Sequence, residues 1–242
     1  MTLDIRQQAQ EDEYSFPYHH LVQLAPFSTS RVLFWGLEYA AYITLVLDEL
    51  SKFPWSTLLE VGCGDGKFVA EAARRFPSCS ITGADFSERA ILFARAFNYG
   101  NGAEFFCGDI RDLNRTFETV VLIETLEHIP EVEITGFVET LRARLEPGST
   151  LIVTVPTTNI PLQSKHYRHY TLELLEKQLT GFSLVHARYA VKTGLLRRFL
   201  FRLTARQCGS VFTRFAVALS RRFLVDATAT NGRHIVAVFS RT

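Results

Sequence analysis

Two short stretches of this chain concentrate the side chains that could do chemistry. The first runs from Glu124 to His128 and reads Glu-x-x-Glu-His. The second, residues 165–170, places His166 and His169 beside a lysine, an arginine and two tyrosines. Histidine can act as a general base because its ordinary pKa is near neutral. Carboxylate oxygens and imidazole nitrogens also bind Mg²⁺, Mn²⁺ or Zn²⁺. The two stretches therefore predict either a proton-transfer site or a metal site.

A glycine-rich stretch predicts a cofactor for this chemistry. Residues 58–68 read as a buried strand, a loop with Gly62, Gly64 and Gly66, and the start of a helix. The glycines allow a tight turn and close approach of a ligand to the backbone. Dinucleotide loops read Gly-x-Gly-x-x-Gly and place a pyrophosphate at the helix N-terminus. Here Lys67 occupies the position of the third glycine, so a ligand without a pyrophosphate is expected.

Three further apolar stretches each end in an acidic residue. Asp85 closes the next predicted strand, and Phe86 follows it. Asp109 and Ile110 follow the third strand, and Glu124 follows the fourth. A carboxylate at the position of Asp85 can accept hydrogen bonds from both ribose hydroxyls. Phe86 and Ile110 can pack on an adenine ring, and Asp109 can accept from its amino group. The alternative is that these acids only cap helices.

This ordered series resembles the class I S-adenosylmethionine (SAM)-dependent methyltransferases over about residues 57–155. Glu60 and the three glycines match the first motif of that family, and the strand ends match the next three. The resemblance implies that the glycine loop holds the methionine part of SAM, Asp85 the ribose and Asp109 the adenine. The expected cofactor-binding residues are Glu60, Gly62, Cys63, Gly64, Asp85, Phe86, Asp109, Ile110 and Glu124.

The Glu-x-x-Glu-His stretch is also similar to the metal-binding motif of the Hen1 family of small-RNA 2′-O-methyltransferases. That resemblance implies a divalent metal held by Glu124, Glu127, His128 and His169, with His166 as an alternative last ligand. Similar stretches occur in methyltransferases without a known metal. Without a metal, the expected catalytic residues are His128, His169 and His166, facing the methyl acceptor. His128 could also have only a structural, hydrogen-bonding role.

The alternation of strands and helices predicts an α/β fold with a doubly wound, mostly parallel sheet of seven strands. The core is expected over residues 54–189, with the last strand over residues 231–242. The family resemblance implies that this last strand inserts antiparallel. Ser87 and Thr171 are expected to cap the helices that follow them.

Residues 1–53 are expected to form an N-terminal helical cap over the SAM pocket. Residues 1–13 are polar and are expected to fray, whereas residues 31–50 predict a helix. Tyr18, His19 and His20 either line the pocket or pack the cap onto the sheet. The loop at residues 156–170 is expected to close over the acceptor together with these three residues.

Residues 190–230 form a basic insert before the last strand. Eight lysines and arginines precede its first acidic residue, Asp226, and its apolar residues follow helical spacing. The expected structure is a pair of helices with solvated arginines. The alternatives are a wall for an anionic substrate or, over residues 190–225, contact with a membrane surface.

Composition limits the classes of function. The 242 residues carry a net charge of +1 and are 47% hydrophobic, which suits a packed core and argues against a general polyanion binder. The N-terminus lacks a signal-peptide pattern, and no apolar run is long enough to span a membrane. The four cysteines form no Cys-x-x-Cys pair. We therefore expect a cytoplasmic protein with reduced thiols.

Three functions fit these patterns. The first is methyl transfer from SAM to a small molecule, at an oxygen of a metabolite, sugar or lipid-like intermediate, with an anionic acceptor as one option. The second is methylation of RNA of the metal-dependent Hen1 type; the near-zero net charge argues against it and the basic insert for it. The third is SAM binding without catalysis. The sequence does not distinguish O- from N- or C-methylation, and it leaves the oligomeric state open.

Overall fold

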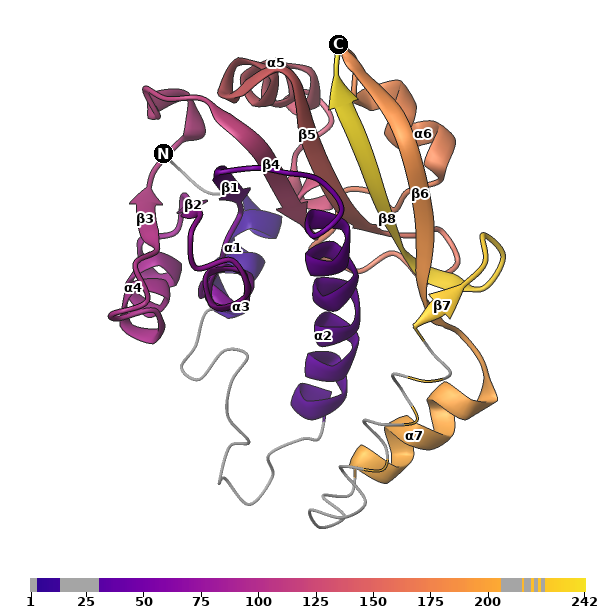
Figure 1. The fold of residues 1–242 in the computed structure, drawn as a ribbon. Helices are drawn as coiled ribbons and strands as arrows, with labels where there is room; N and C mark the ends of the chain where they lie inside the picture. The colour runs from indigo at the N-terminus through magenta and orange to yellow at the C-terminus, as the bar shows by residue number, and fades with distance from the viewer. Residues whose placement is uncertain (1–3, 14–30, 206–214, 216–218, 220–221, 223–224) are drawn as a thin grey trace.

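The computed structural model describes residues 4–13, 31–205, 215, 219, 222 and 225–242, and these residues form a three-layered α/β fold (Figure 1). The strands are β1 Thr57–Val61, β2 Ser80–Asp85, β3 Glu104–Cys107, β4 Phe117–Ile123, β5 Leu145–Pro156, β6 Phe182–Lys192, β7 Asp226–Ala227 and β8 Gly232–Arg241. The helices are α1 Ile5–Glu13, α2 Arg31–Leu50, α3 Lys67–Arg75, α4 Glu88–Phe97, α5 Ile134–Arg144, α6 Leu172–Gln178 and α7 Leu195–Ala205, with short 3₁₀ turns η1 Ile110–Asp112 and η2 Leu126–His128.

The strands pair in the order β3-β2-β1-β4-β5-β8-β6-β7. The first five are parallel, and β8 lies antiparallel between β5 and β6. This confirms the doubly wound fold and the antiparallel last strand. The chain reverses its direction of winding between β1 and β4, which are neighbours in the sheet. In open sheets of this kind, ligands bind outside the carboxyl ends of the strands at this point.

Apolar side chains on both faces of the central strands explain the layers. Leu58 and Val121 face one side with α2 and α3, while Leu59, Val120 and Leu122 face the other side with α5. All five are fully buried. Strands covered on both faces read as continuous apolar runs, which is the pattern of β1 and β4. Figure 1 shows α5 and α6 on one side of the sheet and α2, α3 and α4 on the other.

Helix starts were predicted correctly where a side chain caps them. The Ser87 hydroxyl accepts from the amide of Ala90 at 3.1 Å, and the Thr171 hydroxyl accepts from the amide of Leu174 at 3.2 Å. Each satisfies a backbone donor that the first helical turn leaves free. None of the helices in the part of the chain that the structure describes combines the length and apolar composition needed to cross a membrane.

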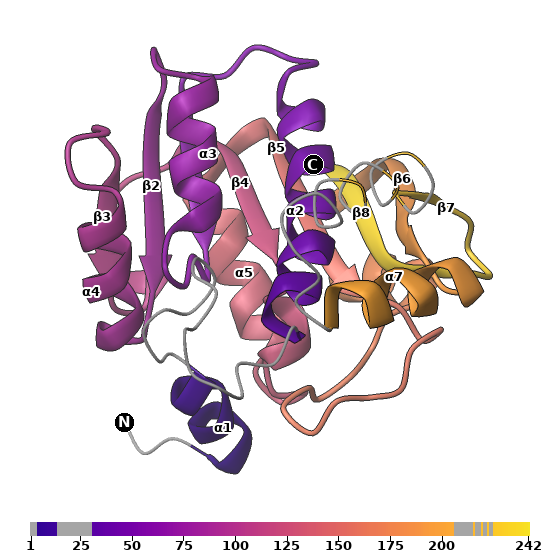
Figure 2. The same ribbon diagram turned by 90° about the horizontal axis from the view of Figure 1, so that it is seen from below.

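Three details at the periphery of the fold differ from the prediction. The sheet has eight strands rather than seven, because β6 runs to Lys192 and its end pairs with the short β7. The predicted all-helical insert therefore contains strand residues at both ends, and α7 is its described helix. The N-terminal residues expected to fray form α1, which lies beneath the edge where β2 and β4 end (Figure 2).

Candidate active site

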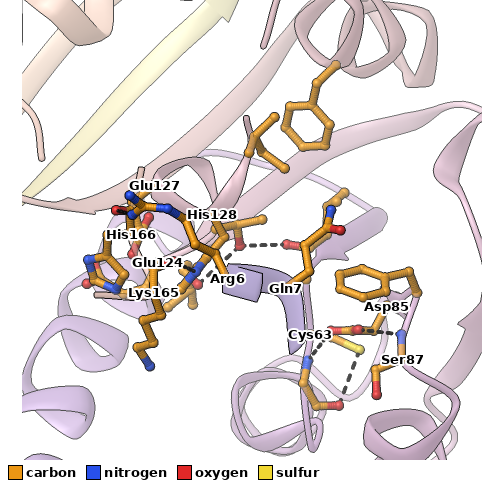
Figure 3. A pocket seen from close by; sticks show the side chains of 18 of the residues that line it. Arg6, Gln7, Cys63, Asp85, Ser87, Glu124, Glu127, His128, Lys165 and His166 are labelled. Atoms are coloured by element: carbon orange, nitrogen blue, oxygen red, sulfur yellow. Dashed lines mark hydrogen bonds between the residues drawn. The ribbon is translucent and has the colours of Figure 1, made fainter. Parts of the chain in front are cut away.

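A cavity of about 670 Å³ lies at the carboxyl edge of the sheet. The loops after β1, β2, β3 and β4 line it, together with α1, α2, the loop after β5 and the start of β8. Figure 3 shows two groups of side chains in this cavity. Cys63, Asp85 and Ser87 form one group, and Glu124, Glu127, His128 and His166 form the other. The cavity therefore joins the predicted cofactor loop to both stretches of chemically active residues.

The loop after β1 adopts a conformation that requires glycine. Gly62, Gly64 and Gly66 have φ angles of 77°, 53° and 74°, in the left-handed region that glycine adopts most readily. The amides of Gly62 and Cys63 donate to the carbonyl of Ala84 at 2.8 and 3.0 Å. A Cβ on Gly62 would lie 2.7 Å from the Thr125 hydroxyl, and that hydroxyl donates to the carbonyl of Val61. Both the positive φ angle and the lack of room for a side chain therefore favour glycine at position 62 of this cavity-lining loop.

We expect Gly62→Ala to weaken SAM binding, with Gly100→Ala as its matched control. Both glycines have a positive φ, so both variants strain the backbone, at about 1–2 kcal/mol each. Only Gly62 also meets a side chain, because no atom lies within 4 Å of a Cβ at Gly100. The clash is expected to cost about 1–3 kcal/mol more in the free energy of unfolding. Urea denaturation and calorimetric titration with SAM measure the two effects. Equal SAM affinities in the two variants would contradict this role of the loop.

Asp85 occupies the predicted position and organises the loop. Its carboxylate accepts from the amide of Gly64 and from that of Ser87, both at 2.9 Å. Asp85 is buried, with 5% of its surface exposed, and it lines the cavity. A carboxylate offers about four acceptor positions, so one carboxylate can accept from backbone amides and from ligand hydroxyls together. Asp85 can thus shape the loop and bind a ligand at the same time.

The predicted adenine end also lies on the cavity wall. Phe86 is 56% exposed and Ile110 is buried, so an aromatic face is available beside an aliphatic side chain. Asp109 accepts hydrogen bonds from the Arg111 amide at 2.8 Å and from its Nε at 2.9 Å. The Arg111 side chain lowers the pKa of Asp109. Asp109 is therefore an ionised acceptor, although it also begins η1, as the helix-cap alternative predicted.

Two predicted cofactor-binding residues differ from the others. Glu60 is fully buried and is not among the residues that line the cavity. Burial and the neighbouring Asp65 and Asp85 raise its pKa well above the ordinary value, and it lies behind the loop. Cys63 does line the cavity, and burial raises the pKa of its thiol. Neither side chain is poised to act as a charged ligand.

Glu124 is the residue at the turn after β4, and it is tied to β8. Its φ is 51°, an uncommon value for a residue other than glycine. Its carboxylate accepts from the Thr154 hydroxyl at 3.0 Å and lies 3.0 Å from His234 Nδ1. Burial alone would raise the pKa of Glu124, but His234 leaves it below the ordinary value. His234 lines the cavity as well, and sequence reasoning missed it because β8 is remote in the chain.

The three histidines form a chain that fixes their tautomers. His128 Nδ1 lies 3.3 Å from the carbonyl of Lys165, and His169 Nδ1 lies 3.1 Å from that of Ile160. A carbonyl only accepts, so both Nδ1 atoms carry the proton. His169 Nε2 then accepts from His166 Nδ1 at 2.9 Å. As a result, His128 and His166 each keep a lone pair on Nε2.

The histidines differ in their access to the cavity. His128 and His166 line it, whereas His169 is buried behind His166 and is not among the lining residues. Burial lowers the pKa of His128 to about 4 and that of His166 to about 2, and it lowers the pKa of His169 as well. Burial therefore favours the neutral form of all three rings. His169 therefore positions His166 and does not itself face a ligand.

Helix α1 supplies residues that the sequence did not predict for the site. The Arg6 guanidinium donates to the carbonyls of Ser164 and His166 and lies 4.9 Å above the Tyr167 ring. The Tyr167 hydroxyl donates to Asp4. Arg6 and Gln7 line the cavity, and Figure 3 shows them between the two groups of side chains. The loop after β5 thus packs against α1, whereas its predicted partners Tyr18, His19 and His20 lie outside the described residues.

Helix α2 covers the cavity beside the histidines. Glu38, Tyr39 and Tyr42 line the cavity, and the Tyr42 ring lies 4.8 Å from that of His234. Glu38 pairs with Arg233 at 3.3 Å and also with Arg197 of α7. The predicted cap therefore reaches the site through α2. The ion pair with Glu38 neutralises the charge of Arg197, one of the basic residues of the insert.

The family comparison decides the class of the core. Residues 58–148 match the model of a methyltransferase domain family. The predicted resemblance to class I SAM-dependent methyltransferases is confirmed for this domain. The family model is a general one and does not bear on the small-RNA subfamily.

Relatives and solved structures agree with this domain. The chain is 30% identical over 130 residues to trans-aconitate 2-methyltransferase of Deinococcus radiodurans, which is 54% of this chain and 49% of that protein. It is 29% identical over 133 residues to a fatty-acid O-methyltransferase of Mycolicibacterium smegmatis. This match covers 53% of the present chain and 48% of that enzyme. The chain therefore spans about half the length of these relatives. Magnesium protoporphyrin IX methyltransferase from Synechocystis PCC 6803, with bound SAM, shares the fold with a TM-score of 0.62 at 15% identity, covering 100% and 99% of the two chains.

Proposed function

We propose that this protein transfers the methyl group of SAM to an oxygen of a small-molecule acceptor. One observation carries the proposal: a single cavity joins the glycine loop and Asp85 to the polar group around His128 and His166. SAM bound along the loop would direct its methyl group toward that polar group. The volume of about 670 Å³ is in the range of small-molecule sites.

The choice of oxygen rests on the relatives and on the site. Relatives named as acting on fatty acids, on ubiquinone intermediates and on malonyl-acyl carrier protein are O-methyltransferases. In the reaction, an acceptor oxygen attacks the methyl carbon and forms the O–CH₃ bond. The S–CH₃ bond breaks, its electron pair stays on sulfur, and S-adenosylhomocysteine leaves. The neutral Nε2 atoms of His128 and His166 can accept a hydrogen bond from an acceptor hydroxyl, orient it, and pass the proton that it loses on to water.

Titration calorimetry followed by acceptor screening tests this function. The full-length chain should bind SAM and S-adenosylhomocysteine with one site each. With methyl-labelled SAM, label should transfer to carboxylic acids, hydroxy acids or phenols, and the product should hydrolyse or fragment as an ester or ether. Amines and RNA serve as comparison acceptors. Transfer only to amines would contradict the oxygen assignment, transfer only to RNA the small-molecule assignment, and SAM binding without turnover of any acceptor would indicate a non-catalytic protein.

A further inference from the structure

Glu127 forms a cluster with His128 and His166, and the methyl transfer described above gives the Glu127 carboxylate no role. Their potential ligand atoms all lie within 4.8 Å of one another. Glu127 and His128 belong to the turn η2 after β4, and His166 to the loop after β5. Figure 3 shows the three side chains together at one end of the cavity. Two separate loops thus converge on one small volume.

The hydrogen bonds around the histidines leave both rings ready to bind a cation. The carbonyl of Lys165 fixes the proton of His128 on Nδ1. The carbonyl of Ile160 acts on His166 through His169, whose Nε2 accepts from His166 Nδ1. Metal-binding histidines commonly donate their second N–H to a carbonyl or other acceptor, which fixes the ring and its tautomer. Both rings already have such a support.

Glu127 would supply a carboxylate ligand, and with it a negative charge, to a bound cation. It has no exposed surface, and neither of its carboxylate oxygens has a hydrogen-bond partner among the described residues. Arg168 is close, but its guanidinium engages Glu131 at 2.8 Å and the carbonyl of Leu126 at 3.1 Å. Buried carboxylates are ordinarily hydrogen-bonded, paired with a charge or bound to a metal. The side chain of Glu127 therefore lacks the partner that its burial calls for.

We infer that Glu127, His128 and His166 bind a divalent transition-metal ion at the acceptor end of the cavity. Two imidazoles and one carboxylate suit Zn²⁺, Fe²⁺, Mn²⁺ or Co²⁺ better than Mg²⁺, which favours oxygen ligands. Three protein ligands leave coordination positions open, as in catalytic metal sites. The set differs from the one that the sequence resemblance implied. Glu124 is engaged by Thr154 and His234, and His169 supports His166 from behind.

The role of this ion rests on the proposed function. All three ligands line the cavity, so an open coordination position can face the acceptor. An acceptor hydroxyl bound to the ion would lose its proton to water more readily, and its oxygen would then attack the methyl carbon of SAM. A carboxylate acceptor would bind the ion already ionised. In both cases the ion would orient the acceptor oxygen in line with the S–CH₃ bond.

Metal titration of the tag-free, chelator-treated, full-length protein tests the site. Co²⁺ is followed by its visible absorption and Mn²⁺ by electron paramagnetic resonance, with Zn²⁺ by competition. The wild-type protein should bind one ion per chain. Glu127→Gln and His166→Asn should each weaken binding by at least about tenfold. Glu139→Gln, which removes an exposed carboxylate of α5 that is not among the cavity-lining residues, should leave it unchanged.

Measurements on the same samples separate the two proposals. Circular dichroism establishes that the variants are folded, and calorimetry gives their affinity for SAM. SAM binding without binding of any of the three metals would overturn the metal site and leave the proposed function standing. Equal metal affinity in wild type and Glu127→Gln would also overturn it. Metal binding without SAM binding would overturn the proposed function and leave the metal site standing.

Discussion

Replacement of Asp85 by alanine should cost SAM binding about 1–3 kcal/mol, or about 5- to 150-fold in Kd. The carboxylate is expected to accept from the ribose hydroxyls, and it also accepts from the amides of Gly64 and Ser87. Removing it leaves buried donors on the ligand and on the loop without an acceptor. The loss therefore combines a direct contact with a loosened loop. Calorimetry with SAM and S-adenosylhomocysteine measures the change.

Two further variants show which part of the loss is direct. Asp85→Asn keeps one acceptor oxygen and most of the side-chain volume, so its affinity should lie between wild type and Asp85→Ala. Asp112→Ala removes a carboxylate of η1 that is not among the cavity-lining residues, and it should leave the Kd unchanged. If Asp85→Ala is folded and binds SAM as tightly as wild type does, the assignment of Asp85 to the ribose is wrong.

The part of the site that follows from local sequence could be predicted. Gly62, Asp85 and Asp109 lie at the carboxyl end of a strand or within two residues of it, and parallel strands bring these ends to one edge of the sheet. Once the strands are recognised, the positions of these residues are fixed within a few ångströms. The same reasoning located Glu124 and the histidine stretches. Local pattern was sufficient wherever backbone geometry alone determines position.

Long-range partners could not be predicted in this way. His234 reaches Glu124 only because β8 inserts between β5 and β6, and the sequence does not show which side chain of β8 meets which turn. Arg6 was missed because its helix is polar and gains its place from contacts with the loop after β5. Which of His166 and His169 lines the cavity depends on the path of that loop, and the sequence does not show this path. These contacts depend on tertiary packing, which carries no local signal.

The sequence also predicted only part of the structure of the basic insert. Its first helix, α7, was expected from the spacing of its apolar residues, and Leu200 is indeed buried. Arg197 pairs with Glu38 of α2 and so connects the insert to a wall of the cavity. Leu195 and Phe199 remain 81% and 55% exposed. An anionic-substrate wall formed by residues 190–230 and contact of residues 190–225 with a membrane surface both stay predictions.

Removal of the cavity-facing imidazoles should give the largest loss of turnover. With an acceptor identified by the screen, His128→Asn and His166→Asn should each lower kcat by about 10²–10⁴-fold, the range expected for loss of a group that positions or deprotonates a nucleophile. Both residues lie at the end of the cavity away from Asp85 (Figure 3). The affinity for SAM should therefore stay close to that of wild type. Single-turnover kinetics with labelled SAM and calorimetry measure the two quantities separately.

His169→Asn distinguishes a positioning role from direct contact with the acceptor. His169 is not among the cavity-lining residues and acts through its hydrogen bond to His166, so its replacement should lower kcat less than that of His166. Asparagine offers both a donor and an acceptor, which allows part of the support of His166 to persist. If the three variants instead lose thermal stability while kcat per folded molecule is unchanged, the histidines only stabilise the loop after β5. The reaction would then proceed by proximity of acceptor and methyl group alone.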